Sequence, residues 1–153
     1  MDGIEIRKIT RAGDIPLELL LLADPSEKCI EDYIGRGEAF GAFTESLIVG
    51  VYVLIRTRPL TVELVNIAVD EKYQGGGIGK RLVADAAKRA GAMGAKVLEV
   101  GTGNSSISQL AFYQRCGFRI TGVDRDFFRI HGSGNIVENG IECIDMVRLS
   151  MLL

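Results

Sequence analysis

Between residues 38 and 69 the chain carries three strand-like runs in close succession. The runs EAFGAFTE, SLIVGVYVLIR and LTVELVNIAV have a period of two and are rich in β-branched and aromatic residues. Only short polar breaks separate them. Three successive antiparallel strands are the simplest arrangement for such a block, and the remaining elements must cover the faces of that sheet.

The residues before this block predict one strand and two helices. IEIRKI at residues 4–9 alternates apolar and polar positions, which predicts a first strand. IPLELLLLA predicts a helix, and a second helix opens at DPSE and runs to Gly35. In the second helix we expect Asp24 as the N-cap, Pro25 at the first helical position and Glu27 closing a capping box.

After the block, helices and strands alternate. A long helix is predicted from Ile78, because apolar residues recur there three and four positions apart, and KVLEVG predicts the strand after it. ISQLAFYQRC predicts a further helix, with Asn104, Ser105 and Ser106 available as N-caps and GF at 117 and 118 as its C-terminal cap. FRITGV and IECIDMVRLSML predict the last strands, and the NG pair at 139 and 140 predicts a hairpin turn.

The predicted order is therefore β-α-α-β-β-β-α-β-α-β-β. It indicates an α/β (α+β) fold, with a mixed, mostly antiparallel central sheet of about seven strands flanked by helices. A chain of 153 residues, 47% of them hydrophobic, can bury enough surface to fold without a metal or a disulfide. We expect a single domain over residues 1–153.

Composition and charge argue against several classes of partner. The net charge is −2 and there is no long basic run, so nucleic acid is not expected as a partner. The longest apolar run, LLLLA, is too short for a membrane span, and the N-terminus lacks an apolar signal core. Cys29, Cys116 and Cys143 lie far apart, which predicts reduced thiols, a cytoplasmic location and no metal site. HGSGN at residues 131–135 is expected to form a mobile loop.

The stretch YQGGGIGKRL, residues 73–82, has unusual chemistry for the start of a helix. Helices normally open on Ser, Thr, Asp or Asn with acid in the first turn, whereas here glycines are followed by Lys80 and Arg81. Each interior Gly costs about 0.8 to 1 kcal/mol relative to Ala, so the stretch sacrifices local stability. A bound anion would compensate, because glycines let it approach the backbone N–H groups and the two cations would then pair with it.

Two common anion-binding patterns do not fit this stretch. A P-loop would need Gly where Gln74 stands and a hydroxyl residue where Arg81 stands. The dinucleotide pattern Gly-x-Gly-x-x-Gly fails because Gly77-Ile78-Gly79 continues to Leu82.

The pattern that does fit is Gln-x-x-Gly-x-Gly, formed by Gln74, Gly77 and Gly79 directly after a strand. In this respect the sequence resembles the GNAT superfamily of acetyl-CoA-dependent N-acetyltransferases. NIAVDEKYQGGGIGKRL is similar to that family's pyrophosphate-binding strand and loop, and AFYQRCGF is similar to its later helix. The predicted order of elements agrees over nearly the whole chain.

The resemblance implies where acetyl-CoA binds. The diphosphate would lie on backbone N–H groups of the loop that follows Gln74, at Gly75, Gly76, Gly77, Ile78, Gly79 and Lys80. The pantetheine arm would lie like an extra strand against Ile67, Ala68 and Val69. For this, LTVELVNIAV and KVLEVG must splay apart. An N–H near Ile67 or Ala68 would then stabilise the oxyanion of the tetrahedral intermediate, a role worth about 3 to 4 kcal/mol.

Transfer to an amine needs a base, and Glu63 is the candidate. An alkylammonium with a pKa of about 10 is roughly 0.1% neutral at pH 7. In TVELVNIAV the alternation places Glu63 on one strand face with Val65, Ile67 and Val69. Apolar neighbours raise a carboxyl pKa, and the family often places a Glu on this strand that acts through a water. An exposed or purely structural Glu63 remains the alternative.

The departing thiolate needs an acid, and Tyr113 matches the family tyrosine that donates to the sulfur. The alternative is that Tyr113 only packs its ring. Seven residues before it many family members carry an Asn that contacts the arm, whereas this chain has Ser106. Either Asn104 or Ser106 could make that contact.

The function expected from the resemblance is direct acetyl transfer to a primary amine of a small molecule or peptide. A non-catalytic acyl-CoA sensor and a P-loop-like nucleotide binder are the competing hypotheses. The acceptor is not identified by fold-level likeness. The terminal strands could pair in a homodimer.

Overall fold

The computed structural model describes residues 3–132 and 135–153. Residues 133 and 134, in the predicted loop at 131–135, lie outside the described residues. The elements in chain order are β1 (Ile4–Ile9), α1 (Leu17–Ala23), α2 (Glu27–Arg36), β2 (Glu38–Thr44), β3 (Leu47–Arg58), β4 (Thr61–Val69), α3 (Ile78–Ala92), β5 (Val97–Gly103), α4 (Ile107–Arg115), β6 (Arg119–Asp124), α5 (Phe127–Ile130), β7 (Val137–Glu138), β8 (Ile141–Glu142) and β9 (Met146–Leu152).

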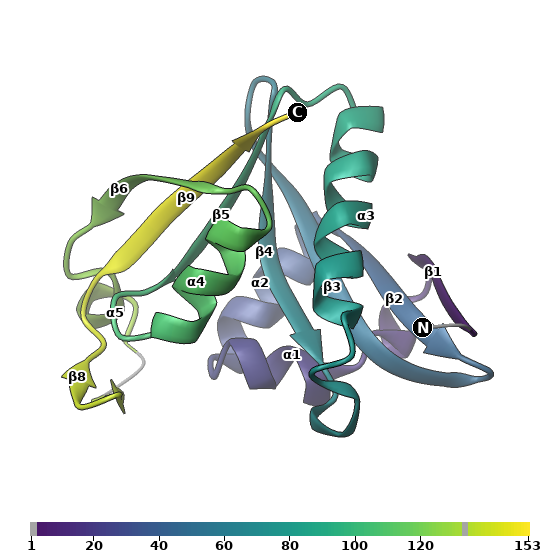
Figure 1. Ribbon diagram of the computed structural model, residues 1–153, viewed down its shortest axis with the longest axis horizontal. Coiled ribbons are helices and arrows are strands. Elements are labelled where there is room, and N and C mark those ends of the chain that lie inside the picture. Colours follow the sequence, from purple (N-terminus) through teal and green to yellow (C-terminus); the bar gives the residue numbers. More distant parts are fainter. Residues whose placement is uncertain (1–2, 133–134) are drawn as a thin grey trace.

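One mixed sheet organises these elements. Its strand order is β1-β2-β3-β4-β5-β9-β6, in which β4 and β5 are parallel and all other neighbours are antiparallel. The predicted block of three antiparallel strands is confirmed as β2, β3 and β4, and so is the predicted class of fold. Helices α3 and α4 lie on the front of the sheet in Figure 1, and α1 and α2 lie behind it. Within the described residues, no helix is both long and apolar enough to cross a membrane.

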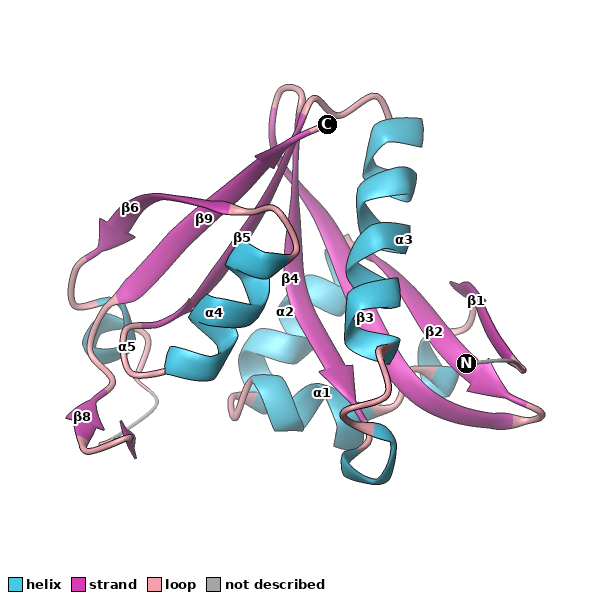
Figure 2. Ribbon diagram, viewed as in Figure 1, coloured by secondary structure: helices cyan, strands magenta, loops and turns pink. Residues whose placement is uncertain are grey.

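Each face of the sheet has its own apolar core. On one side the fully buried side chains from β3, β4, α3, β5 and β9 include Tyr52, Leu64, Ile78, Leu82, Leu98 and Leu149. On the other side α1 and α2 cover β1 to β4 with Leu19, Leu20, Ile30 and Tyr33. Figure 2 shows the same layering, with helices on both faces of the strands.

The predicted start of the second helix is wrong by two residues. The N-cap of α2 is Ser26, whose Oγ accepts a hydrogen bond from the Cys29 N–H at 3.2 Å. Asp24 lies outside the helix, because its carboxylate accepts instead from the Ser26 N–H at 2.9 Å and the Tyr33 hydroxyl at 3.0 Å. Since the carboxylate is engaged by these two donors, the serine hydroxyl takes the capping position.

The predicted Asn-Gly hairpin is confirmed, but the last predicted strand is broken. Asn139 and Gly140 both have positive φ, 56° and 74°, as a two-residue turn between β7 and β8 requires. The break between β8 and β9 falls at residues 143–145. There the Asn104 Oδ1 accepts from the backbone N–H groups of Ile144 and Asp145 at 2.8 and 3.0 Å. The Asn104 side chain thus accepts the hydrogen bonds of backbone N–H groups that would pair with a neighbouring strand if the strand were continuous.

A β-bulge in β4 corrects the predicted face of Glu63. The β3–β4 register passes from Val53↔Asn66 to Leu54↔Leu64, so that Val65 is an extra residue without a partner. Leu64 and Ile67 both face the α3 side, although they are three residues apart. Glu63 and Val65 therefore share the α1 side, whereas Ile67 and Val69 do not lie on that face.

Candidate functional site

Strands β4 and β5 pair over only three residue pairs and then diverge. Their last pair is Glu63↔Glu99, although β4 continues to Val69 and β5 to Gly103. The Asp70 N–H donates to the Val49 carbonyl on β3 at 2.8 Å. Hydrogen bonding alternates along an antiparallel ladder, so the N–H groups of Ile67 and Val69 point away from β3, toward the opening beside β5.

The glycine loop lies at the open end of this gap. The Gln74 Nε2 donates to the Val69 carbonyl at 2.9 Å, which ties the loop to the end of β4. Gly75 and Gly77 have φ of 83° and 87°, a conformation that favours glycine. Residues 74–77 are exposed, so their backbone is accessible to a ligand.

Helix α3 begins after this loop without a capping side chain. Gly77 occupies the N-cap position, no side chain bonds there, and the first turn carries no acid. The N–H groups of this turn thus present a partial positive charge to whatever occupies the loop. Arg81 also contacts the first strand, because its Nη2 donates to the Ile4 carbonyl of β1 at 3.1 Å. A Cβ on Gly79 would lie 3.3 Å from the Phe112 ring, so glycine allows α3 and α4 to approach closely here.

Tyr113 is held in the core on the α3 side of the sheet. Helix α4 ends as predicted on Gly117, with φ of 107°, and the Phe118 N–H donates to the Tyr113 carbonyl at 3.0 Å. The rings of Tyr113 and Phe118 pack edge to face at 5.6 Å. Tyr113 is 5% exposed, and burial raises the pKa of its hydroxyl well above the ordinary value. The hydroxyl therefore stays protonated, as a proton donor must.

The predicted caps of α4 are used differently. Ser106 occupies the N-cap position, but its side chain makes no cap hydrogen bond. Its hydroxyl and that of Ser105 instead donate to the Glu138 Oε1 of β7, at 2.9 and 3.1 Å. The Asn104 amide also donates to the Glu142 carbonyl at 3.1 Å, in addition to the two bonds it accepts. Asn104 is thus occupied on both sides by the β8–β9 connection.

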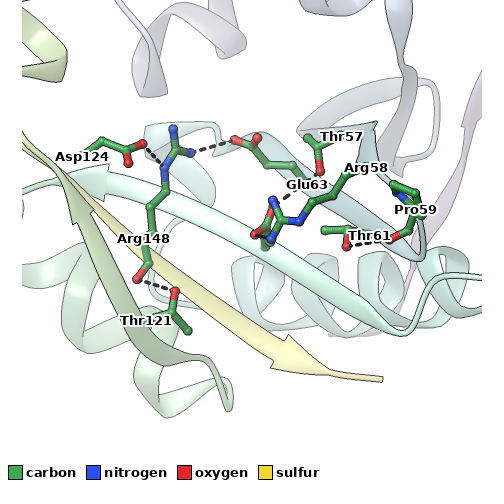
Figure 3. Close-up of polar contacts among 9 residues, drawn as sticks. Thr57, Arg58, Pro59, Thr61, Glu63, Thr121, Asp124 and Arg148 are labelled. Carbon is green, nitrogen blue, oxygen red and sulfur yellow. Dashed lines mark hydrogen bonds and ion pairs between the residues drawn. The ribbon is translucent and has the colours of Figure 1, made fainter.

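On the opposite face of the sheet the diverging strands border a pocket of about 260 Å³, called here the polar pocket. It is lined by Thr57, Arg58, Glu63, Glu99, Asp124 and Arg148. The charged side chains come from five strands, β3, β4, β5, β6 and β9, and Figure 3 labels Arg58, Glu63, Asp124 and Arg148 among them. Arg58 bonds both carboxylate oxygens of Glu99. Arg148 donates from Nε to Asp124 at 2.7 Å and from Nη1 to Glu63 at 3.5 Å.

Burial raises the pKa of Glu63, and the nearby Glu99 and Asp124 raise it further. The guanidinium groups of Arg148 and Arg36 act in the opposite direction. The Glu63 side chain is 18% exposed, so solvent can still reach it. A carboxylate with a raised pKa that remains accessible can accept a proton near neutral pH.

Sequence reasoning found Glu63 but missed the rest of the polar pocket. Glu99 had a readable signal, since the alternation of KVLEVG places it on the face opposite Leu98 and Val100. Arg148 and Asp124 had none, because they meet Glu63 only through the strand order β4-β5-β9-β6. In residues 3–132 and 135–153 no group of three or more His, Cys, Asp or Glu side chains could hold a metal ion.

Comparison with known proteins shows which family the chain belongs to. The model of the acetyltransferase (GNAT) family matches residues 16–118. The chain is 52% identical over 149 residues to the uncharacterized N-acetyltransferase YvbK of Bacillus subtilis (strain 168), covering 97% of this chain and 96% of that protein. A GNAT family acetyltransferase from Elizabethkingia anophelis with acetyl-CoA bound superposes with a TM-score of 0.96 and 46% identity, over 100% of both chains. A Bacillus subtilis acetyltransferase in complex with CoA gives a TM-score of 0.92 and 51% identity, over 98% of this chain and 99% of that one.

The chain belongs to the acetyltransferase (GNAT) family. It is an acetyl-CoA-dependent N-acetyltransferase, with acetyl-CoA as co-substrate. This places it among enzymes and sets aside the hypothesis of a P-loop-like nucleotide binder.

We expect coenzyme A to protect the amides of residues 75–81 from hydrogen exchange more strongly than those of any other segment. The reason is that the backbone of residues 75–77 is exposed and the first N–H groups of α3 lack an acceptor within the helix, so the diphosphate would cover groups that otherwise exchange readily. Hydrogen–deuterium exchange with mass spectrometry, with and without coenzyme A, measures this. Protection of equal size elsewhere, or none in this segment, would contradict the location of the diphosphate.

Proposed function

We propose that the enzyme transfers the acetyl group of acetyl-CoA directly to a primary amine within a ternary complex. The observation that carries this proposal is the divergence of β4 and β5, which lies between the glycine loop and the polar pocket. A thioester in the gap could be reached from the polar pocket by an amine without a covalent acyl-enzyme.

On the cofactor side, the proposal assigns the diphosphate to the loop after Gln74 and the pantetheine arm to the edge of β4. The outward N–H of Ile67 supports an oxyanion role, since a fixed backbone donor costs no reorganisation when charge develops on the carbonyl oxygen. The Ala68 N–H is less suited, because the ladder alternation turns it toward β3. For contact with the arm, Ser106 is the better candidate, because its hydroxyl donates to Glu138 but its oxygen can still accept, whereas the Asn104 amide is engaged both as donor and as acceptor.

On the acceptor side, Glu63 takes the proton of the incoming ammonium. Ile67 lies four positions after Glu63, about 13 Å along an extended strand, so one or more waters must relay the proton. The neutral amine attacks the thioester carbon, a C–N bond forms and the C–S bond breaks. Tyr113 then gives its proton to the thiolate, while the acetylated nitrogen releases its remaining extra proton to water, from which Tyr113 is protonated again. The polar pocket contains three carboxylates and two guanidinium groups, a balance that favours a cationic acceptor.

With a panel of polyamines, aminoglycosides, amino acids and peptides, we expect an amine-dependent release of free thiol and an acetylated product detectable by mass spectrometry. Because both substrates must be bound together, initial rates at varied concentrations of each should give intersecting reciprocal plots. Parallel plots, or release of stoichiometric thiol without amine, would indicate an acyl-enzyme instead. Binding of acetyl-CoA without turnover for any amine would favour the acyl-CoA sensor.

Glu63→Gln is expected to lower kcat/KM by about 100-fold or more, the usual contribution of a general base. Because the raised pKa of Glu63 protonates it as the pH falls, wild-type activity should decline on the acidic side through that pKa, and the variant should lack this limb. Glu99→Gln is the matched control in the same pocket, and we expect about tenfold loss or less, since Glu99 is engaged by Arg58. A larger loss in Glu99→Gln would transfer the role of base to Glu99.

Tyr113→Phe is expected to slow turnover by about tenfold or more, with little change in melting temperature, because only the proton donor is lost. Steady-state kinetics and thermal unfolding test the two parts separately. Tyr73→Phe serves as the control, since Tyr73 also packs on the same apolar core just before the loop. Equal rates in wild type and Tyr113→Phe would leave Tyr113 with a packing role only.

A further inference from the structure

Arg148 reaches Glu63 by crossing a strand that carries no side chain at that point. Arg148 is on β9 and Glu63 on β4, and β5 lies between them with Gly101 directly opposite Arg148. A Cβ on Gly101 would lie 3.1 Å from the Arg148 Nη1 and 2.7 Å from the Met146 Sδ. The absence of that Cβ thus leaves room for the guanidinium to extend over β5.

Other contacts fix the guanidinium on the far side of this crossing. Its Nε is paired with Asp124 of β6 at 2.7 Å. Its Cζ lies 5.5 Å from the centroid of the Phe127 ring at the start of α5. The same side chain extends Nη1 toward Glu63 at 3.5 Å (Figure 3). The Arg148 side chain is 29% exposed, so its guanidinium is partly shielded from solvent.

Charged groups from every surrounding element face Glu63. Glu99 on β5 and Asp124 on β6 are acidic, and Arg148 on β9 and Arg36 on α2 are basic. Arg58 on β3 completes the set, but its guanidinium is bonded to both oxygens of Glu99. Arg148 is therefore the cation whose contact with Glu63 is direct, and its loss would leave Glu63 with burial and two acidic neighbours, opposed by Arg36.

We propose that Arg148 is a positioning residue that extends over Gly101 to hold the Glu63 carboxylate at the polar pocket in its proton-accepting form. Its consequence for catalysis rests on the proposed role of Glu63 as base. The holding contact itself does not depend on that role.

The test measures the titration of Glu63 and the pH dependence of the rate in the same variants. In ¹³C NMR of the unliganded enzyme, with Glu63→Gln for assignment, Arg148→Gln is expected to raise the titration midpoint of the Glu63 carboxyl by about one pH unit or more. The acidic limb of kcat/KM should move up by the same amount. At pH values above the shifted limb the rate should recover to within about threefold of wild type, because the base is again ionised. A merely structural role would lower the rate at every pH.

Three further variants make the result specific. Arg58→Gln removes an equal charge from the same pocket without touching Glu63, and it should shift the midpoint by less than half as much. Arg148→Lys should restore part of the shift, since an ammonium keeps the charge but not the fork that serves two carboxylates. Gly101→Ala displaces the guanidinium with Arg148 in place, and it should shift the midpoint in the same direction. Because this variant keeps the arginine, it also tests the contact if Arg148→Gln does not fold.

The outcomes separate the two proposals. An unchanged Glu63 midpoint in folded Arg148→Gln or Gly101→Ala would overturn the role of Arg148. A raised midpoint with an unmoved acidic limb would support the contact between Arg148 and Glu63, and would overturn Glu63 as the base.

Discussion

The parallel ladder between β4 and β5 ends at Glu63 and Glu99, and the rest of the site depends on that early end. Buried backbone groups need hydrogen-bond partners, so two diverging strands in the middle of a sheet are costly unless something else pairs with them. Here the bulge at Val65 turns β4, while β5 stays paired with β9 along its whole length, over seven residue pairs. The backbone N–H and C=O groups of Ile67 and Val69 that point away from β3 are then available to a strand-like ligand. At the open end the Gln74 side chain already donates a hydrogen bond to the Val69 carbonyl.

The two ends of this gap carry opposite charge. At the loop, an uncapped helix N-terminus followed by Lys80 presents positive potential, which suits the diphosphate of the co-substrate. At the polar pocket, carboxylates outnumber guanidinium groups, which suits an ammonium. The overall charge of −2 shows nothing of this separation. A thioester between the two ends would receive its acceptor from the side opposite the cofactor's diphosphate, as direct transfer requires.

Local signals in the sequence were sufficient for most elements and for the loop, because strand period, helix period and glycine chemistry each act over a few residues. These local signals were insufficient wherever two neighbouring side chains were equally suited to the same structural role. Asp24 and Ser26 are both good caps, and the choice depended on the Tyr33 hydroxyl, which lies nine residues after Asp24, within α2 itself. The bulge at Val65 leaves no mark on the alternation of TVELVNIAV, so Glu63 was grouped with Ile67 on the wrong face. Arg148 lies 85 residues from Glu63 and became a neighbour only through the strand order.

Asn66 shows how the strand next to the bulge is also tied to α1 and α2. It lies one residue after Val65, and its Nδ2 donates to the Leu20 carbonyl at 3.0 Å and to the Tyr33 hydroxyl at 2.8 Å. Tyr33 in turn donates to Asp24, so α1, α2 and β4 share one buried network. The Asn66 Oδ1 has no hydrogen-bond partner within the described part of the chain, and an unmade bond of this kind costs about 1 to 3 kcal/mol. An apolar residue there would avoid that cost but would lose the hydrogen bonds to Leu20 of α1 and Tyr33 of α2. The position of α1 and α2 against the strand that borders the cofactor gap therefore depends on a polar residue whose bonds are only partly satisfied.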